Sequence, residues 1–452
     1  MNPHVFRQYD IRGHAERDFN NDFVRNLGLS LGTFFHARGR REIAVARDCR
    51  LSSPRIYEAL SQGLTETGMR LTNVGVGPTP LLYFAVHHLG LDGGIQITGS
   101  HNPPDENGFK MMVGNGSLYG RDIEELQGIM ERGAFRRDPR GGITDVDLST
   151  DYVAAIASRI DLQRTDIRFA LDAGNGAGGP LAIQTMTALG LDPIPMLCDM
   201  DGTFPVHHAD PTEPETLEML RDRVLSEKLD IGFAFDGDAD RLGVIDARGD
   251  IVWGDRLMIL LSRDLLESHP GSTIIGEVKC SQTMYDDIEA HGGRGILWKT
   301  GHSLIKTKMK EEGALLAGEM SGHIFFADRY YGFDDATYAA LRILEILSRS
   351  DKPLHEMLSD VPETYVTPEI RVPCDDARKF RVVENVVAHY RPTHELVDID
   401  GARIQFDGGW GLVRASNTQP VLVLRFESES ATRLQEIRDE LESVVSRVSD
   451  LD

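Results

Sequence analysis

Three aspartates stand at alternate positions directly after an apolar run, at Asp236, Asp238 and Asp240. A loop that curls at this point can aim all three carboxylates at one hard cation. The pattern begins like an EF-hand, but Arg241 and Ala247 stand where that motif requires glycine and glutamate. Three carboxylates without further protein oxygens are typical of a Mg²⁺ site that stays open for phosphate oxygens, and Arg241 could meet the same anion. A polar solvated turn is the alternative interpretation.

Ser100 follows a second apolar run, at 95–98, and precedes Pro103 and Pro104. Proline has a fixed φ and no amide donor, so the chain cannot continue as a strand there. The loop should therefore hold Ser100 stiffly at the carboxyl edge of a strand, which is a suitable place for a nucleophile. An ordinary turn, in which the hydroxyl satisfies neighbouring backbone groups, explains these residues equally well.

Two further loops combine several polar groups. In the segment 318–323, Glu319, Ser321 and His323 are interleaved with glycines, so that a carboxylate, a hydroxyl and an imidazole can hydrogen-bond the vicinal hydroxyls of a sugar. The segment 414–420 offers a guanidinium, two hydroxyls and an amide, which is a suitable cradle for a phosphate. Its candidate ligands are Arg414, Ser416, Asn417 and Thr418. A plain β-turn is the alternative for this last loop.

The net charge of −23 opposes binding to nucleic acid or to an anionic membrane surface, because a polyanion would meet a repulsive field. An anionic substrate would therefore require a site where arginine and lysine are concentrated locally. Arg7 and Arg12, which flank Tyr9 near the start of the chain, are candidates for such contacts. His302 follows Lys299 at the end of a predicted strand, where a single histidine is more often structural than catalytic.

The chain shows no sign of a membrane or secreted protein. No apolar run approaches the roughly 20 residues that span a bilayer, and the N-terminus lacks a basic segment and an apolar signal core. The four cysteines are scattered without CxxC spacing, which indicates neither a disulfide framework nor a zinc site. We therefore expect a cytoplasmic protein with reduced cysteines.

The elements that must position these residues alternate between strands and helices. In the first part of the chain we predict strands at 43–48, 71–76 and 94–98, and helices at 22–32, 53–67 and 80–89. The second helix should have Ser53 as its N-cap and Pro54 at its first position. Two more series of similar rhythm follow, which indicates three α/β units with mainly parallel sheets. After Pro362 the pattern changes to α+β. The predicted domains cover 1–146, 147–252, 253–364 and 365–452.

One segment favours a different function. Residues 174–179 fit the GxGxxG fingerprint of a dinucleotide-binding turn, and Asp199 follows about 20 residues later. The fingerprint alone is weak evidence, and it lies in the second unit. Pro180 follows its last glycine directly, which is more typical of a tight strand-to-helix turn. A dinucleotide-dependent oxidoreductase is therefore an alternative, which a titration with NADH would test.

Six motifs occur in the order FRQYDIRG, TGSHNP, DGDADR, KTGH, GEMSGH and RASNT. Through them the chain resembles the α-D-phosphohexomutase family over nearly its whole length, and their joint occurrence is far more specific than any single motif. The spelling GEMSGH, together with YDIRG, is similar to the phosphomannomutase/phosphoglucomutase branch. The glucosamine branch commonly has glutamine where Met320 stands, so a phosphoglucosamine mutase is an alternative.

The resemblance implies a fold and a site. It implies three similar mixed α/β domains and a smaller C-terminal α+β domain around a central active-site cleft, each contributing one loop. Ser100 would carry the transferred phosphoryl group and, with the three aspartates, would hold Mg²⁺. Glu319 and Ser321, with His323 in the same loop, would contact the 3- and 4-hydroxyls of the sugar.

The resemblance also implies a reaction, the reversible transfer of phosphate between hexose 1-phosphate and hexose 6-phosphate, with a 1,6-bisphosphate as intermediate and activator. Mannose and glucose differ only at C2 and should both be accepted. Lys110 and His302 match positions near the reacting hydroxyl and are the candidate acid and base. Arg241 would meet the transferred phosphoryl group. The other phosphate would be held by Arg414, Ser416, Asn417 and Thr418, with help from Tyr9 and Arg12. We expect a monomer or weak dimer.

Two residues depart from the family pattern. Gly99 replaces a frequent alanine and should loosen the loop before Ser100, and Ala239 replaces a frequent glycine and should restrict φ without moving the carboxylates. Two other classes of protein also fit part of the pattern. A metal-dependent serine phosphatase would share Ser100 and the aspartates but would release free phosphate. A sugar-phosphate binding protein without activity would tolerate the loss of Ser100.

Overall fold

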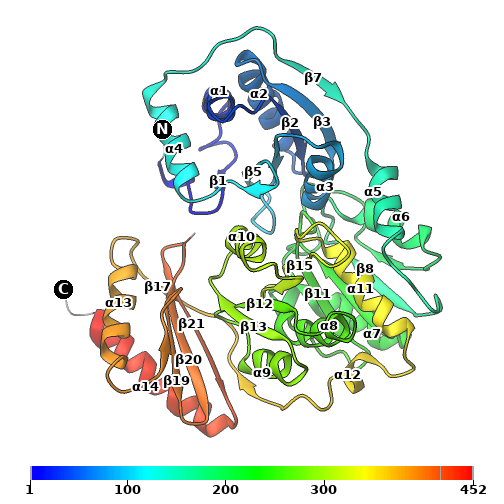
Figure 1. Cartoon of the computed structure of the whole chain (residues 1–452), viewed down its shortest axis with the longest axis vertical. Helices are drawn as coiled ribbons and strands as arrows, with labels where there is room; N and C mark the ends of the chain where they lie inside the picture. The colour runs from blue at the N-terminus through cyan, green and yellow to red at the C-terminus, as the bar shows by residue number, and fades with distance from the viewer. Residues whose placement is uncertain (1–2, 418, 450–452) are drawn as a thin grey trace.

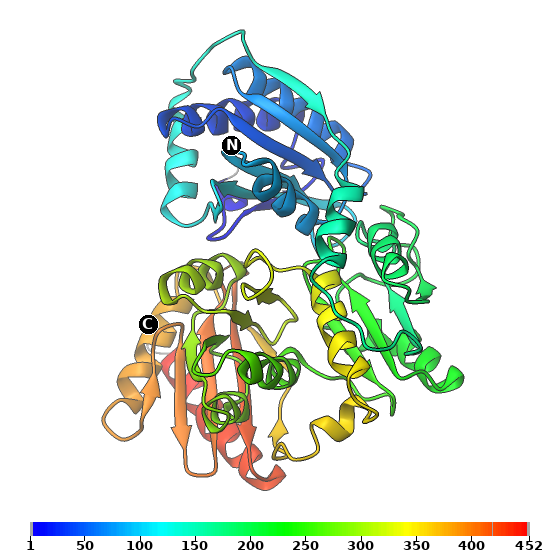
Figure 2. The same cartoon turned by 45° about the vertical axis from the view of Figure 1, so that its right-hand side comes forward.

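The computed structural model describes residues 3–417 and 419–449. They form four domains that follow one another along the chain, and Figures 1 and 2 show them in two views. In Figure 1 the first domain (blue and cyan) lies at the top, and the second and third (green to yellow) lie below it to the right and in the centre. The fourth domain (orange and red) lies beside the third.

The first domain is built on a seven-stranded sheet with the order β1-β5-β4-β2-β3-β7 and with β6 paired to β5. The strands are β1 (Ile11–His14), β2 (Glu42–Arg47), β3 (Arg70–Val76), β4 (Gly93–Ile97), β5 (Glu106–Val113), β6 (Gly116–Ser117) and β7 (Gly142–Asp145). The helices are α1 (Asn21–Ala37), α2 (Ser53–Glu66), α3 (Thr79–Leu89) and α4 (Arg121–Arg132).

The second and third domains each contain a four-stranded sheet, with the orders β11-β10-β8-β9 and β13-β12-β14-β15. The elements of the second are α5 (Ser149–Ala157), β8 (Phe169–Asp172), α6 (Gly179–Ala188), β9 (Ile194–Met196), α7 (Glu218–Glu227), β10 (Ile231–Phe235) and β11 (Leu242–Asp246). Those of the third are α8 (Gly254–Ser268), β12 (Thr273–Glu277), α9 (Gln282–Ala290), β13 (Arg294–Trp298), α10 (His302–Glu312), β14 (Leu316–Gly318), β15 (Ile324–Phe326), α11 (Ala336–Ser348) and α12 (Leu354–Met357).

One four-strand pattern recurs in these three domains. The pattern is formed by β2 to β5, β8 to β11 and β12 to β15. In each set the first three strands are parallel neighbours, and the third pairs antiparallel with the fourth. These hairpins are β4–β5, β10–β11 and β14–β15. The three α/β domains therefore share one topology. Parallel pairing prevails in the sheets of the second and third domains, as predicted, and each of the three sheets also contains an antiparallel hairpin.

The fourth domain is a smaller α+β unit with an antiparallel sheet of order β16-β21-β20-β19-β18, to which β17 is added beside β21. Its strands are β16 (Tyr365–Val366), β17 (Ile370–Pro373), β18 (Leu396–Val397), β19 (Ala402–Phe406), β20 (Gly409–Ala415) and β21 (Val421–Ser428). Its helices are α13 (Lys379–Tyr390) and α14 (Ala431–Ser449), which pack on one face of the sheet.

A continuous apolar core joins the first three domains. It contains Tyr83 and Phe84 of α3, Tyr152 of α5, and much of α8 and α11. The ring of Tyr83 lies 5.4 Å from that of Phe333 in the third domain. Because the burial of aromatic side chains strongly favours association, this core should hold the first three domains together.

Two details of the predicted elements are wrong. Helix α2 has Ser52, not Ser53, at its N-cap, because the Ser53 hydroxyl bonds the Asp48 carboxylate at 2.5 Å. Strand β5 was not predicted; it reverses direction after the two prolines and pairs antiparallel with β4. In the described ranges, no helix is both long and apolar enough to cross a bilayer.

Candidate active site

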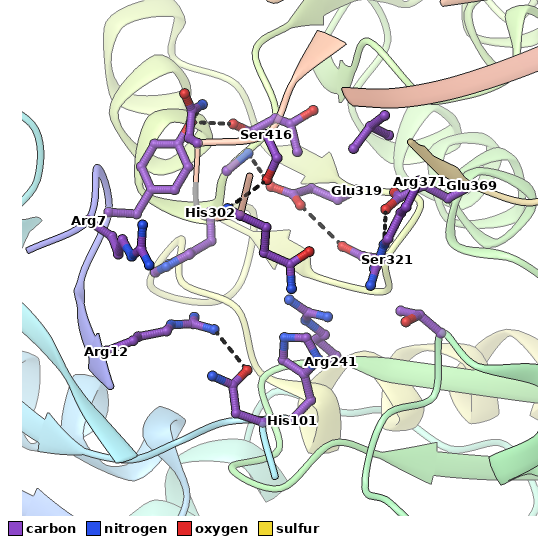
Figure 3. Close-up of a pocket in the computed structure, with 18 of the residues that line it drawn as sticks. Arg7, Arg12, His101, Arg241, His302, Glu319, Ser321, Glu369, Arg371 and Ser416 are labelled. Carbon is purple, nitrogen blue, oxygen red and sulfur yellow. Dashed lines mark hydrogen bonds and ion pairs between the residues drawn. The ribbon is translucent and has the colours of Figure 1, made fainter. Parts of the chain in front are cut away.

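All four domains contribute to a cavity of about 910 Å³, part of which Figure 3 shows. Its volume lies within the range of small-molecule sites. The predicted residues that line it are Tyr9, Arg12, Arg241, His302, Glu319, Ser321, His323, Arg414, Ser416 and Asn417. Thr418 lies outside the described residues. Residues predicted from five separate segments thus meet in one place.

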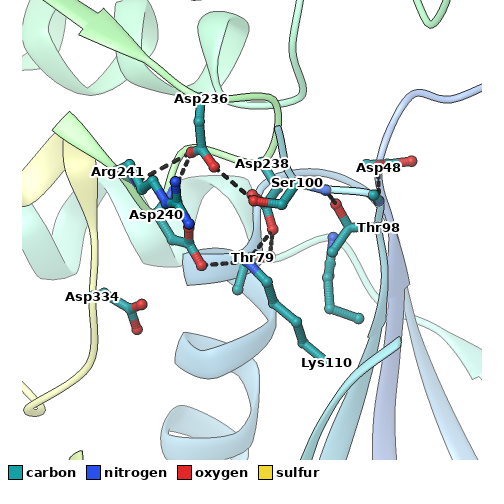
Figure 4. A network of polar contacts seen from close by, with 12 residues as sticks. Asp48, Thr79, Thr98, Ser100, Lys110, Asp236, Asp238, Asp240, Arg241 and Asp334 are labelled. Atoms are coloured by element: carbon teal, nitrogen blue, oxygen red, sulfur yellow. Dashed lines mark hydrogen bonds and ion pairs between the residues drawn. The ribbon is translucent and has the colours of Figure 1, made fainter. Parts of the chain in front are cut away.

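Ser100 lies beside this cavity, on the turn between β4 and β5, and its side chain is nearly completely buried. Its φ of 51° is in the left-handed region, which a non-glycine residue adopts at a cost in free energy. The Ser100 hydroxyl donates to Asp236 Oδ2 at 2.8 Å (Figure 4), and its amide donates to Thr98 Oγ1 at 2.9 Å. His101 and Asn102, the next residues, line the cavity.

A buried arginine fixes the Ser100 loop. The Arg50 guanidinium donates to the carbonyl oxygens of Ser100 at 2.9 Å, Asn102 at 2.6 Å and Glu106 at 3.0 Å. A Cβ atom on Gly99 would overlap the guanidinium carbon of Arg50. Gly99 therefore does not loosen the loop, contrary to the expectation from the sequence. It allows Arg50 to approach closely enough to clamp it.

The three aspartates of the metal loop lie fully buried opposite Ser100, and their ligand atoms are within 4.8 Å of one another. Asp238 Oδ2 accepts hydrogen bonds from Lys110 Nζ at 2.7 Å and from the Thr79 hydroxyl. Asp238 Oδ1 and Asp240 Oδ1 have no hydrogen-bond partner within the described part of the chain. Buried acceptor oxygens without donors are costly, so these residues fit a site that binds a cation.

Lys110 lies on β5 and forms ion pairs with both Asp238 and Asp240 (Figure 4). Burial opposes the ammonium charge, but the three aspartates outweigh it and raise the pKa of Lys110 above the usual lysine value. Burial, followed by the charges of Asp238 and Asp240, raises the pKa of Asp236. A divalent cation here would relieve this repulsion between carboxylates.

Two histidines lie between the metal loop and the cavity. The Arg241 Nε donates to His323 Nε2 at 3.0 Å, and His323 Nδ1 lies 2.9 Å from Asp334 Oδ2. The ring of His302 stacks on that of His323 at 5.6 Å. Burial, followed by the charge of nearby Lys306, lowers the pKa of His302 well below the usual value. His302 is therefore a neutral imidazole at pH 7.

The loop between β14 and β15 presents Glu319 and Ser321 to the cavity (Figure 3). Glu319 Oε1 accepts the amide of Gly301 at 2.9 Å, and Glu319 Oε2 accepts the Ser321 hydroxyl at 3.2 Å. Glu319 is itself almost fully buried. The carboxylate is thus oriented before any ligand binds, and each of its oxygens retains lone pairs for further donors.

Arg414, at the end of β20, is held by Asp400 in the same domain through bonds of 3.1 and 3.4 Å. Asn417 Nδ2 donates to the Tyr9 hydroxyl at 2.6 Å, so the first and fourth domains meet at this loop. On the opposite wall, Arg12 bonds Asp10 at 2.5 Å and Asn102 at 3.5 Å. Cationic side chains thus face the cavity from both sides, despite the negative net charge of the chain.

Several cavity residues were missed from the sequence. Lys279 lies just after β12, and its Nζ is 3.1 Å from Glu369 Oε2 of the fourth domain. Arg371 bonds the other oxygen of Glu369 at 3.1 Å. Lys279 could have been recognised as a site residue from the sequence, because it follows an apolar run that forms β12, as Ser100 and Asp236 follow the runs that form β4 and β10. Glu369 and Arg371 carry no local signal.

The glycine-rich segment 174–179 has a structural explanation. The amide of Ala177 donates to the Gly237 carbonyl at 2.9 Å, and a Cβ atom on Gly178 would overlap the Cβ of Ala239. Ala239 has a φ of 55°, and its methyl group occupies the space that Gly178 leaves. The glycines therefore pack against the metal loop instead of forming an open dinucleotide site.

Family models cover almost the entire chain. They are described as phosphoglucomutase/phosphomannomutase α/β/α domain I at residues 3–137, domain II at 150–249, domain III at 253–365 and the C-terminal domain at 369–444. The chain is 42% identical over 445 residues to a phosphoglucomutase of Neisseria meningitidis, covering 98% of this chain and 96% of the relative. It is 43% identical over 446 residues to a phosphomannomutase/phosphoglucomutase of Pseudomonas putida, with the same coverage.

A solved structure agrees with these matches. The crystal structure of a phosphoglucomutase/phosphomannomutase family protein from Burkholderia thailandensis superposes with a TM-score of 0.93 at 40% identity, over 99% of this chain and 98% of that one. The fold, the order of the domains and the sequence therefore all match those of phosphoglucomutases and phosphomannomutases. The chain belongs to the phosphoglucomutase/phosphomannomutase family.

Proposed function

We propose that the protein interconverts hexose 1-phosphate and hexose 6-phosphate, with mannose and glucose as sugars, through a phosphorylated Ser100 and a bound hexose 1,6-bisphosphate. The observation that carries the proposal is the 2.8 Å contact between the Ser100 hydroxyl and Asp236 beside a four-domain cavity. The relative at 42% identity is named for glucose alone and the relative at 43% for both sugars; the second name supports dual specificity.

Asp236, Asp238 and Asp240 would hold Mg²⁺ together with an oxygen of the group on Ser100. When bound, the ion would neutralise charge on the transferring phosphoryl group. Two observations support a cation at this site. Asp238 Oδ1 and Asp240 Oδ1 accept no hydrogen bond from the described residues, and a cation would relieve the repulsion among the three buried carboxylates. The Lys110 ammonium lies next to these carboxylates, and the Arg241 guanidinium also interacts electrostatically with Asp236 and Asp240.

The transfer itself requires little covalent chemistry from the protein. The free sugar hydroxyl attacks the phosphorus of phospho-Ser100, the bond between phosphorus and Ser100 Oγ breaks, and the proton of the hydroxyl passes to a base. In the second half, Ser100 Oγ attacks the phosphorus of the other phosphate of the bisphosphate, the bond between that phosphorus and the sugar oxygen breaks, and the sugar oxygen takes up the proton that the serine hydroxyl gives up. Since Lys110 is held charged by two aspartates and His302 is neutral, we assign the base to His302 and charge stabilisation to Lys110.

Substrate recognition would be divided between two loops. Glu319 and Ser321 would accept and donate hydrogen bonds to the 3- and 4-hydroxyls, with His323 behind them, bound to Arg241. The phosphate that does not react would be held by Arg414, Ser416, Asn417 and Thr418, with help from Tyr9, which accepts from Asn417, and from Arg12 on the opposite wall of the cavity. Because no contact depends on C2, mannose and glucose should react comparably.

Three further parts of the proposal are independent of the chemistry. We propose a cytoplasmic location, which agrees with four free cysteines, and a monomer or weak dimer. We also propose that the second, third and fourth domains begin at residues 147, 253 and 365.

The test combines mass spectrometry with kinetics. The purified protein should gain the mass of one phosphoryl group after incubation with glucose 1,6-bisphosphate, and should then convert mannose 1-phosphate and glucose 1-phosphate in a coupled assay. Accumulation of free phosphate at the rate of substrate loss would instead indicate a phosphatase. Turnover of glucosamine 1-phosphate above both other sugars would indicate a phosphoglucosamine mutase.

A further inference from the structure

Glu277 is a buried carboxylate that the proposed reaction does not use. It is the last residue of β12, which lies between β13 and β14 in the sheet of the third domain. Its side chain has no exposed surface. The carboxyl ends of parallel strands meet at one edge of a sheet, so a side chain at the end of the central strand can reach the loops of both neighbours.

The two oxygens of Glu277 accept hydrogen bonds from three different loops. Oε2 accepts the amide of Lys279 and the hydroxyl of Thr300, both at 2.8 Å. Oε1 accepts the amide of Met320 at 3.4 Å. All three partners are donors, which matches an ionised carboxylate that can only accept.

Each of these donors belongs to a residue that lines the cavity. Lys279 follows β12, Thr300 follows β13, and Met320 stands between the proposed sugar ligands Glu319 and Ser321. Lys279 Nζ also lies 3.9 Å from Glu277 Oε1 and 3.1 Å from Glu369. Glu277 thus contacts the wall of the cavity from behind at three points, without reaching the cavity.

Thr300 extends this network to the other domains. Its amide donates to Asp400 Oδ2 of the fourth domain at 3.0 Å, and its carbonyl accepts the Tyr9 hydroxyl of the first domain at 3.1 Å. Asp400 also binds Arg414. The polar atoms of Thr300 therefore connect three domains, and Glu277 holds the side chain of this shared residue.

We infer that Glu277 is a positioning residue for sugar-phosphate binding, because one buried carboxylate sets the mutual arrangement of the Lys279, Thr300 and Met320 loops. This inference rests on the proposed function. Since the loops that Glu277 joins carry proposed substrate contacts and not Ser100 or the three aspartates, loss of this anchor should weaken substrate binding more than it slows turnover.

Glu277→Gln tests the inference with a side chain of the same size. The amide nitrogen of glutamine would face a donor, either Thr300 or the backbone of the neighbouring loops, so the three loops could no longer all be satisfied. We expect KM for glucose 1-phosphate to rise about 10- to 100-fold with kcat changed less than about threefold. Calorimetry should show an equal loss of affinity for glucose 1-phosphate.

The matched control is Glu345→Gln. Glu345 is a buried glutamate on α11 of the same domain, paired with Arg329 at 2.6 and 2.9 Å and absent from the cavity lining. This variant should lower the melting temperature but leave KM unchanged. An equal rise in KM for both variants, or an unchanged KM for Glu277→Gln, would overturn the inference.

Thr300→Val provides a second variant that removes only one hydroxyl next to Glu277, in case Glu277→Gln does not fold. It should raise KM several-fold, and an unchanged KM would contradict the inference. Wild-type protein without mutase activity would refute the proposed function instead. The calorimetric comparison of wild type and variants would then still decide whether Glu277 positions a sugar-phosphate site.

Discussion

Three loops of this protein occupy the same position in three copies of one topology but differ in exposure and chemistry. The Ser100 loop joins β4 to β5, the metal loop joins β10 to β11, and the Glu319 loop joins β14 to β15. The first two are buried against each other, whereas the third faces the cavity. The loop between the two antiparallel strands is therefore polar in all three domains. The residues that surround each loop determine which chemical groups it can bind.

The buried pair shows how two such loops become one reaction centre. Arg50 fixes the Ser100 loop from the first domain, and the Ser100 carbonyl lies where a Cβ atom on Gly237 would stand. Lys110 reaches from the first domain to the aspartates of the second. The Glu319 loop contacts the end of the metal loop, because Arg241 Nε donates to His323 Nε2 and the Leu242 amide donates to the Gly322 carbonyl, and it is supported from behind by Glu277. Under the proposed function, the rigid pair of loops would hold the transferring phosphoryl group, and the cavity would hold the sugar.

The largest effect should come from Ser100→Ala. Removal of the phosphoryl acceptor should reduce turnover at least about 10³-fold and abolish the mass gain with glucose 1,6-bisphosphate, because no other group can replace it. Ser262→Ala, which changes a buried serine on α8, should retain activity within about twofold. Retained turnover in Ser100→Ala would exclude the phosphoserine.

An intermediate effect is expected from Glu319→Gln in the open loop. Loss of a charged acceptor that bonds Gly301 and Ser321 should lower kcat/KM about 10- to 100-fold. Mannose 1-phosphate and glucose 1-phosphate should suffer equally, since the loop is proposed to contact hydroxyls that both sugars share. Glu311→Gln, at an exposed site on α10, is the control. A loss confined to one sugar would contradict the proposed contacts.

The smallest effect concerns the packing behind the metal loop. Gly178→Ala should destabilise the protein by about 1–3 kcal/mol, because its new methyl would overlap that of Ala239. Ala239→Gly alone should change stability by less than about 1 kcal/mol, since relief of the left-handed φ offsets the added freedom of glycine.

The double variant Gly178→Ala with Ala239→Gly should recover most of the lost free energy of unfolding, measured by denaturant titration, because the Cα of residue 239 lies 3.8 Å from the new Cβ atom. If the two single effects simply add, the two positions are not in contact as described.

The sequence by itself determined the loops and the order of the elements. Each predicted active-site loop after a strand is found at the end of that strand, because an apolar run followed by glycine, proline or several polar residues has few other local solutions. Strand β3 and helix α2 lie within one residue of the predicted ends, and the family follows from motifs that are local in sequence. The repeated α/β rhythm was also visible in the sequence.

Only the tertiary structure decided which residues act together. The ion pairs of Lys110 span 128 and 130 residues of sequence, and the hydrogen bond between Tyr9 and Thr300 spans 291. The Gly99 and Gly178 contacts, the role of Glu277 and the Glu369–Lys279 pair depend on domains that pack on one another. Local sequence patterns carry the preferences of single segments, whereas these contacts are fixed by how buried surfaces of different domains fit together.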